Sequence, residues 1–141
     1  MKTVTCKSEE ETMTHARQVG DESSPGDIIC LRGELGAGKT HFVKGFVRAF
    51  GISPETVSSP TFSIIQEYHG RLPVYHFDFY RIENAQEALE IGAEEYFYGD
   101  GVSIIEWPER VEAILPDNVK QIEIASINNT TREITISRPF S

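Results

Sequence analysis

Short apolar and alternating segments recur along the chain and predict a protein built on a β-sheet. The segments of strand character are residues 2–6, 27–32, 61–68, 73–80, 102–105, 119–127 and 132–138. The third and fourth are separated only by His69-Gly70-Arg71-Leu72, and the last two by Asn128-Asn129-Thr130-Thr131, so each pair predicts a hairpin. Because hairpin strands are antiparallel, the pattern predicts a mixed sheet of roughly seven strands.

Segments with helix-start signals lie between these strands. Helices are expected over residues 9–19, 40–50, 85–97 with an interruption at Gly92, and 108–115. Ser8-Glu9-Glu10-Glu11 is a capping box, Asn84 is a favourable N-cap residue, and Pro108 suits a first helical position. Gly51 supplies a stop for the second helix.

The most specific motif lies between the second strand segment and the second helix. Gly33-Glu34-Leu35-Gly36-Ala37-Gly38-Lys39-Thr40 fits the phosphate-binding pattern of glycine, four residues and Gly-Lys-Ser/Thr. Glycines let the loop wrap tightly and turn backbone N–H groups toward phosphate oxygens, and the N-terminus of the following helix adds partial positive charge. Lys39 is expected to be an exposed cation that reaches the β- and γ-phosphates, and the Thr40 hydroxyl is placed to ligate Mg²⁺.

The alternative interpretation of this motif is a glycine-rich turn with a solvated lysine. Strand, loop and helix occur in the order that phosphate binding requires, which favours the phosphate loop. The pattern as a whole predicts an α/β fold, in which residues 1–141 form a single-domain P-loop NTPase-like fold with a mixed, roughly seven-stranded sheet flanked by helices. A domain of this length is small for a phosphate-loop enzyme that carries its own lid and acceptor site.

Charge and composition narrow the classes of protein to which the chain could belong. A net charge of −9 and a pI near 4.9 argue against extended contact with nucleic acid, so another protein would have to hold any RNA. No apolar run approaches the ~20 residues of a membrane span, and the first residues lack the apolar stretch of a signal peptide. We therefore expect a cytoplasmic protein with no membrane contact. Cys6 and Cys30 lie in strand-like segments and are expected to be buried thiols.

A phosphate loop needs an acid to hold Mg²⁺ or its waters and a group to position the attacking water. Glu106 follows the strand segment Val102-Ser103-Ile104-Ile105, which is apolar except for Ser103, as the second acid of a phosphate-loop enzyme should, although it could instead cap the helix after Pro108. Alternation places His76, Asp78 and Tyr80 on one strand face, which indicates either the lining of a site or a solvent-facing edge of the hairpin.

Thr61 follows Ser58-Ser59-Pro60 and is similar to the mobile threonine that senses a γ-phosphate in nucleotide switches. It could equally be an ordinary residue at the start of a strand. Glu9 suits the dipole of the first helix, and that role alone explains its acidity, so a contact between Glu9 and a nucleotide is the less favoured hypothesis.

Four blocks occur in one order and spacing along the chain: the phosphate loop, Ser59-Pro60-Thr61-Phe62, His76-Phe77-Asp78-Phe79-Tyr80-Arg81 and Ile105-Glu106-Trp107-Pro108. With these blocks the chain resembles the bacterial TsaE family, the ATPase component of tRNA threonylcarbamoyladenosine biosynthesis. The resemblance extends from Glu11-Thr12 to the C-terminal hairpin, and four matched blocks are far more specific than the loop alone.

The resemblance implies a small Mg²⁺-dependent ATPase that binds ATP or ADP and works with TsaB and TsaD, which transfer the threonylcarbamoyl group to tRNA. The family member itself does not form that bond and meets tRNA only through the complex. By resemblance, Thr40 and Glu106 would ligate Mg²⁺, Asp78 would support hydrolysis, and Thr61 would lie in a switch-like segment.

The resemblance also implies which residues surround the base. The family places adenine between the start of the first helix and the C-terminal region, which makes Glu9 and Arg132 candidates for contact with it. His41 extends the phosphate loop where the family often has a second threonine, and we include it among the nucleotide-binding residues.

Two other functions are compatible with a phosphate loop. A small-molecule kinase uses the same loop for phosphoryl transfer, but it usually needs a lid with several arginines, and here Arg71, Arg81 and Arg110 are scattered. The third hypothesis is a nucleotide-dependent binding module whose output is an exchange of partners.

Overall fold

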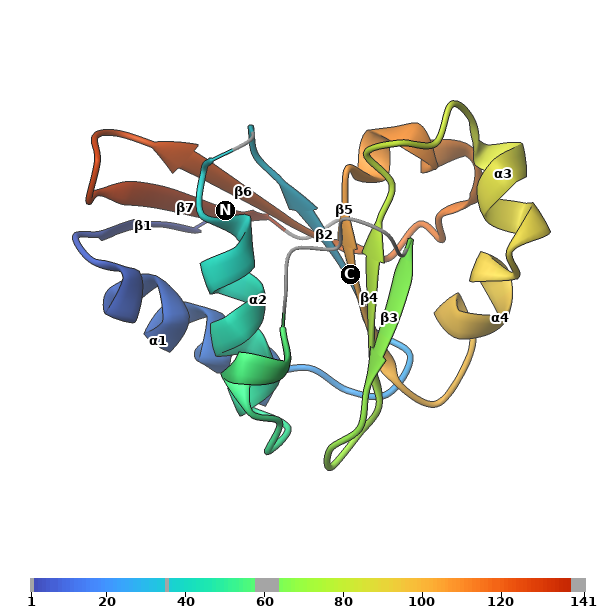
Figure 1. Ribbon diagram of the computed structural model, residues 1–141, viewed down its shortest axis with the longest axis horizontal. Helices are drawn as coiled ribbons and strands as arrows, with labels where there is room; N and C mark the ends of the chain where they lie inside the picture. Colours follow the sequence, from blue (N-terminus) through green and yellow to red (C-terminus); the bar gives the residue numbers. More distant parts are fainter. Residues whose placement is uncertain (1, 35, 58–63, 138–141) are drawn as a thin grey trace.

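A seven-stranded sheet forms the centre of the computed structural model, with the strands in the order β1-β7-β6-β2-β5-β4-β3 (Figure 1). The structure describes residues 2–34, 36–57 and 64–137. The strands are β1 (Lys2–Cys6), β2 (Ile28–Arg32), β3 (Ile65–Tyr68), β4 (Val74–Asp78), β5 (Val102–Glu106), β6 (Lys120–Ser126) and β7 (Arg132–Ser137). The four neighbouring strands β6, β2, β5 and β4 run parallel to one another. Strand β1 pairs antiparallel with β7, β7 with β6, and β3 with β4. The predicted mixed sheet and both predicted hairpins are therefore confirmed.

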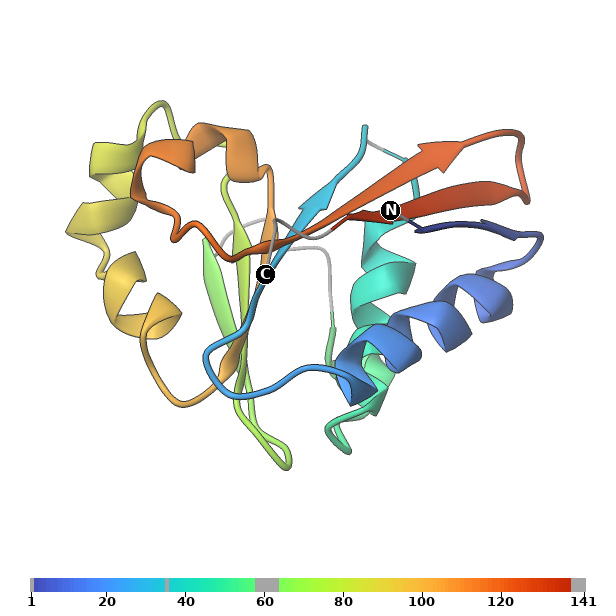
Figure 2. The same cartoon turned by 180° about the vertical axis from the view of Figure 1, so that it is seen from behind.

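Helices cover both faces of the sheet, and two views of the fold separate the two layers (Figures 1 and 2). The helices are α1 (Glu9–Asp21), α2 (Lys39–Arg48), α3 (Ala85–Glu90) and α4 (Ala93–Phe97), with short 3₁₀ helices η1 (Pro54–Thr56), η2 (Pro108–Arg110) and η3 (Glu112–Ile114). One core cluster joins α1 and α2 to the sheet, and a second cluster lies under α3, α4 and the η2–η3 segment. The chain has the predicted α/β fold of the P-loop type.

Close contact between α1 and α2 determines how one side of the site is built. A Cβ atom on Gly45 would lie 2.2 Å from the carbonyl oxygen of Met13, so only glycine allows the two helices to approach this closely. The approach brings the start of α1 to the start of α2, where Glu9 contacts His41. The side chain of Ser8 accepts a hydrogen bond from the backbone N–H of Glu11 at 3.1 Å, which confirms the predicted N-cap.

The segment expected to be a helix over 108–115 is helical, but it is not one continuous helix. The segment forms η2 and η3 instead, and the chain leaves helical geometry between them at Val111, where φ is −130°. Val111 is fully buried in the second core cluster. Among the described residues, no helix is long and apolar enough to cross a membrane.

Candidate nucleotide site

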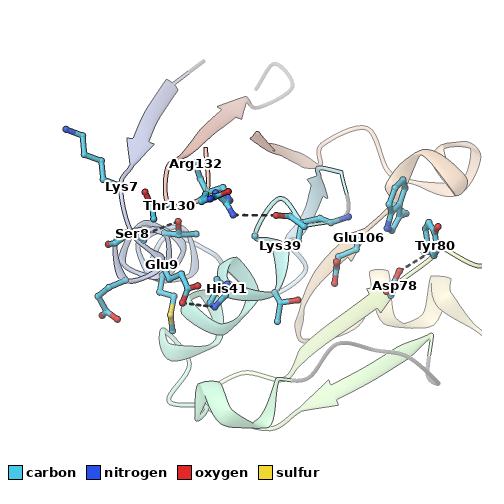
Figure 3. A pocket seen from close by; sticks show the side chains of 18 of the residues that line it. Lys7, Ser8, Glu9, Lys39, His41, Asp78, Tyr80, Glu106, Thr130 and Arg132 are labelled. Carbon is cyan, nitrogen blue, oxygen red and sulfur yellow. Dashed lines mark hydrogen bonds and ion pairs between the residues drawn. The ribbon is translucent and has the colours of Figure 1, made fainter. Parts of the chain in front are cut away.

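A cavity of about 1040 Å³ opens at the carboxyl ends of β2, β4 and β5, where open α/β sheets commonly bind ligands. Its lining comes from the start of α1, the phosphate loop, the ends of β4 and β5, and the β6–β7 hairpin. Figure 3 shows two groups of side chains in it. We call the first the acidic end, formed by Lys39, Asp78, Tyr80, Glu106 and Trp107. The second is the hairpin end, formed by Lys7, Ser8, Glu9, His41, Thr130 and Arg132.

The phosphate loop has the backbone geometry that its glycines predict. Gly36 and Gly38 have φ values of 82° and 101°, a conformation that residues with a Cβ rarely adopt. Gly36, Gly38, Lys39 and Thr40 line the cavity. Gly33, Glu34 and Ala37 belong to the loop but do not line the cavity, and Leu35 lies outside the described residues.

The Lys39 side chain departs from the exposed cation that the sequence predicts. The residue is only 6% exposed, and within the described part of the chain its Nζ is a buried side-chain atom that has no hydrogen-bond partner. Nζ lies 4.2 Å from the centroid of the Trp107 ring, a cation–π geometry. Burial lowers the pKa of the Lys39 ammonium, while the nearby carboxylates of Glu106 and Asp78 act in the opposite direction. A buried unpaired ammonium is costly unless an anion joins it.

Trp107 holds its ring over Lys39 through an unusual backbone conformation. Its φ of 59° and ψ of 51° make it the one positive-φ residue other than glycine among the described residues. Such a conformation costs about 1–3 kcal/mol and persists only where the surroundings hold it. The Trp107 ring packs against the Tyr80 ring at a centroid distance of 4.9 Å, and Pro108 follows directly. The sequence carries no signal for this arrangement.

The two candidate acids end neighbouring parallel strands. Asp78 of β4 and Glu106 of β5 are partners in the strand register, so their side chains leave the same face of the sheet toward the cavity. Desolvation raises the pKa of Asp78, and Glu106 adds to this effect, while a hydrogen bond from the Tyr80 backbone N–H opposes it. Thr61, the third residue predicted to be catalytic, lies outside the described residues.

His76 is buried beside Glu106 rather than exposed on the hairpin. It is 2% exposed, and its Nε2 lies 2.6 Å from Oε2 of Glu106. The Tyr68 hydroxyl lies 3.0 Å from His76 Nδ1 and donates a hydrogen bond to Gln66 Oε1 at 2.5 Å. Alternation placed His76 on the face of Asp78 but did not reveal its contact with Glu106.

At the hairpin end, the Arg132 side chain donates hydrogen bonds to backbone carbonyl oxygens of the phosphate loop and of the hairpin. Its Nε donates to the carbonyl oxygen of Ala37 at 2.9 Å, and its Nη1 donates to those of Asn128 and Thr131 at 2.7 and 3.1 Å. His41 Nε2 lies 3.1 Å from Glu9 Oε2. The structure therefore places Glu9, His41 and Arg132 around one end of the cavity and also gives Arg132 a contact with the loop.

The donors at the acidic end suit a cation that shares its ligands with phosphate and water. Among the described residues, no group of three or more His, Cys, Asp or Glu side chains could hold a metal ion alone. Mg²⁺ usually binds one or two protein oxygens together with substrate phosphates and waters. The Thr40 hydroxyl and the Glu106 carboxylate line the same cavity and fit that type of site.

Replacing Asp78 with asparagine is expected to stabilise the ligand-free protein at pH 7. Because the folded state raises the pKa of Asp78, its contribution to stability is greatest below the unfolded pKa of about 3.9 and falls as the pH rises through the folded value. An asparagine stays neutral and still accepts the Tyr80 N–H, so it avoids this loss. Denaturant unfolding at pH 7 and pH 3.5 measures the effect.

The gain in the free energy of unfolding should be present at pH 7 and absent at pH 3.5. Asp117→Asn, a change at an exposed acid, serves as the control and should have little effect at either pH. A gain of equal size at both pH values would contradict the assigned desolvation of Asp78.

Comparisons with known proteins agree over most of the chain. The family model described as "Threonylcarbamoyl adenosine biosynthesis protein TsaE" matches residues 6–134. The chain is 46% identical over 129 residues to the tRNA threonylcarbamoyladenosine biosynthesis protein TsaE of Bacillus subtilis (strain 168), covering 91% of this chain and 80% of that protein. It is 41% identical to the protein of the same name from Treponema pallidum (strain Nichols), covering 93% and 96%.

The crystal structure of Bacillus subtilis YdiB has the same fold. The two structures superpose with a TM-score of 0.82 at 37% sequence identity, and the match covers 99% of this chain and 86% of the other.

Proposed function

The chain belongs to the TsaE family, and we propose that in tRNA threonylcarbamoyladenosine biosynthesis it binds ATP in the cavity and hydrolyses it with the help of Mg²⁺. The observation that carries the proposal is the buried, unpaired Nζ of Lys39. A phosphate group would give this ammonium the anionic partner that the ligand-free protein lacks. The cavity volume suits a nucleotide-sized ligand.

Each end of the cavity has a separate task in this proposal. The backbone N–H groups of the first turn of α2 have no partner within the helix and would bind phosphate oxygens beside Lys39. Glu9, His41 and Arg132 surround the hairpin end, which would take the base. A nucleotide bound in this way would direct its γ-phosphate toward the two acids.

The acids would then divide the chemistry between them. Bound Mg²⁺ would neutralise charge on the β- and γ-phosphates. The Thr40 hydroxyl and the Glu106 carboxylate would hold the ion or its waters. Asp78, whose pKa is raised by burial, would accept a hydrogen bond from the attacking water and orient it. Thr61 would respond to the γ-phosphate, as the resemblance implies.

Partners complete the proposed function. We propose that TsaB and TsaD transfer the threonylcarbamoyl group and hold the tRNA, and that this chain contacts tRNA only through them. A net charge of −9 supports the indirect contact, because direct binding to RNA relies on clustered lysine and arginine.

The proposal is tested by product analysis over a Mg²⁺ titration. Purified protein with ATP should release ADP and inorganic phosphate in equal amounts, and Glu106→Gln should lower the rate at every Mg²⁺ concentration, because an amide is a poorer ligand for a hard cation. Glu109→Gln, the same change at a residue outside the cavity, is the control.

Transfer of the γ-phosphate to a small-molecule acceptor would favour a kinase instead. Partner binding that depends on ATP or ADP, without hydrolysis, would favour a nucleotide-dependent binding module. Hydrolysis by Glu106→Gln that follows the wild-type Mg²⁺ dependence would remove Glu106 from the proposed mechanism.

A further inference from the structure

A buried chain of hydrogen bonds runs from β3 through β4 to Glu106 on β5. Its members are Gln66, Tyr68, His76 and Glu106, with distances of 2.5, 3.0 and 2.6 Å between successive partners. Tyr68 and His76 are 7% and 2% exposed, and Tyr68 belongs to the core cluster that joins α1 and α2 to the sheet. Of these four residues, only Glu106 has a role in the proposed function.

The donors and acceptors of the chain fix the orientation of the imidazole. The Tyr68 hydroxyl has one proton and donates it to Gln66 Oε1. His76 Nδ1 therefore meets the Tyr68 oxygen as a donor, and Nε2 can donate to the Glu106 carboxylate at the same time only when both ring nitrogens carry a proton. The contact with Tyr68 holds the ring in the plane that directs Nε2 at Glu106. The pairing of β4 with β5 brings these residues together, since His76 lies opposite Ile104, two residues before Glu106.

The bond from His76 involves one oxygen of the carboxylate. Within the described part of the chain, the one side-chain hydrogen bond of Glu106 runs to Oε2, while the residue also lines the cavity. A glutamate has three rotatable side-chain bonds, and an unrestrained carboxylate would sample several positions at the end of β5. Anchoring Oε2 leaves Oε1 in a defined place.

We propose that His76 is a positioning residue that, held by Tyr68, anchors one oxygen of Glu106 so that the other is presented to Mg²⁺ or to a water bound to it. The inference rests on the proposed function, because it assumes that Glu106 serves the metal. When a residue that holds a metal ligand by a hydrogen bond is replaced, metal affinity or activity typically falls by about 10–100-fold.

Two substitutions at His76 separate anchoring from packing. In His76→Gln the side-chain amide nitrogen can reach the place of Nε2 and donate to Glu106. In His76→Asn the amide reaches only the place of Nδ1, next to Tyr68, and leaves Glu106 without its partner. Both variants shorten or replace a buried ring, so a role in packing alone would affect them alike.

The readout is the Mg²⁺ concentration that gives half of the metal-dependent gain in ADP affinity, measured by calorimetry without turnover. We expect His76→Asn to raise this concentration about 10–100-fold and His76→Gln to stay within about threefold of the wild type. ADP affinity in EDTA should remain within about twofold for both, since the phosphate loop is unchanged. Equal shifts in the two variants, or none in His76→Asn, would overturn the proposal.

Two further variants make every outcome decisive. Tyr68→Phe removes only the hydroxyl that holds the imidazole, and a rise of a few-fold supports the proposal, whereas a wild-type value contradicts it even where His76→Asn fails to fold. Glu106→Gln tests the premise. Unchanged Mg²⁺ dependence in Glu106→Gln would refute the metal role of Glu106 and this inference with it, while a shift in Glu106→Gln alone would refute only the role of His76.

Discussion

Replacing Lys39 with alanine is expected to weaken ATP binding by up to about hundredfold, because a charge-assisted contact to phosphate is worth up to about 3 kcal/mol and each 1.4 kcal/mol is tenfold. The same change removes an ammonium that is buried without a hydrogen-bond partner in the described part of the chain. The ligand-free variant should therefore be at least as stable as the wild type. Calorimetric titration with ATP and a thermal melt measure the two effects.

The control is Lys44→Ala, which removes a lysine from the same helix at a position that does not line the cavity. It should bind ATP as the wild type does. Comparable ATP affinity in the Lys39 and Lys44 variants would show that the loop does not bind phosphate through Lys39.

Addition of TsaB and TsaD is expected to raise the ATPase rate by roughly 10³ to 10⁵, the range that a group supplied in trans provides in related phosphate-loop enzymes. Of the Lys and Arg residues that line the cavity, only Lys39 is buried beside the two acids. The Arg132 guanidinium already donates to backbone carbonyls of the loop and the hairpin, and Arg81 is exposed. Phosphate release by the protein alone and by the three proteins together measures the effect.

Arg81 is the internal control for this prediction, because it is an exposed arginine at the edge of the cavity. If the missing cation comes from a partner, Arg81→Ala should leave the slow rate of the isolated protein almost unchanged. A large loss in this variant would instead identify Arg81 as the stabilising group, and a rate for the isolated protein equal to that of the complex would refute activation by partners.

Local features of the site could be predicted because neighbouring residues determine them. The glycine spacing of the loop requires positive φ at Gly36 and Gly38, and both have it. The N-caps at Ser8 and Asn84 rest on side chains that bond to the backbone three residues later. The hairpins follow from alternation and short connections, so the order of most elements was accessible from the sequence.

Features that depend on packing between distant segments could not be predicted. The contact between His76 and Glu106 requires the register of two parallel strands, and alternation alone cannot tell whether the face of His76 is buried. Lys39 is buried because the ring of Trp107 covers it, and the left-handed backbone of Trp107 has no signal in the sequence.

The bond between Arg132 and the loop carbonyl of Ala37 joins residues 95 positions apart. It depends on where the β6–β7 hairpin lies relative to the loop. The sequence identified Arg132 only through the family resemblance, and the contact itself came from the structure.

The central claim is that ATP hydrolysis at this site drives tRNA modification, and the most direct measurement is a reconstitution with TsaB, TsaD, tRNA, threonine, bicarbonate and ATP. Turnover of ATP and formation of modified tRNA would be followed together for the wild type and for Asp78→Ala. We predict that Asp78→Ala still binds ATP through the loop and loses hydrolysis and multi-turnover modification in parallel. Full multi-turnover modification by the Asp78→Ala variant would contradict the account.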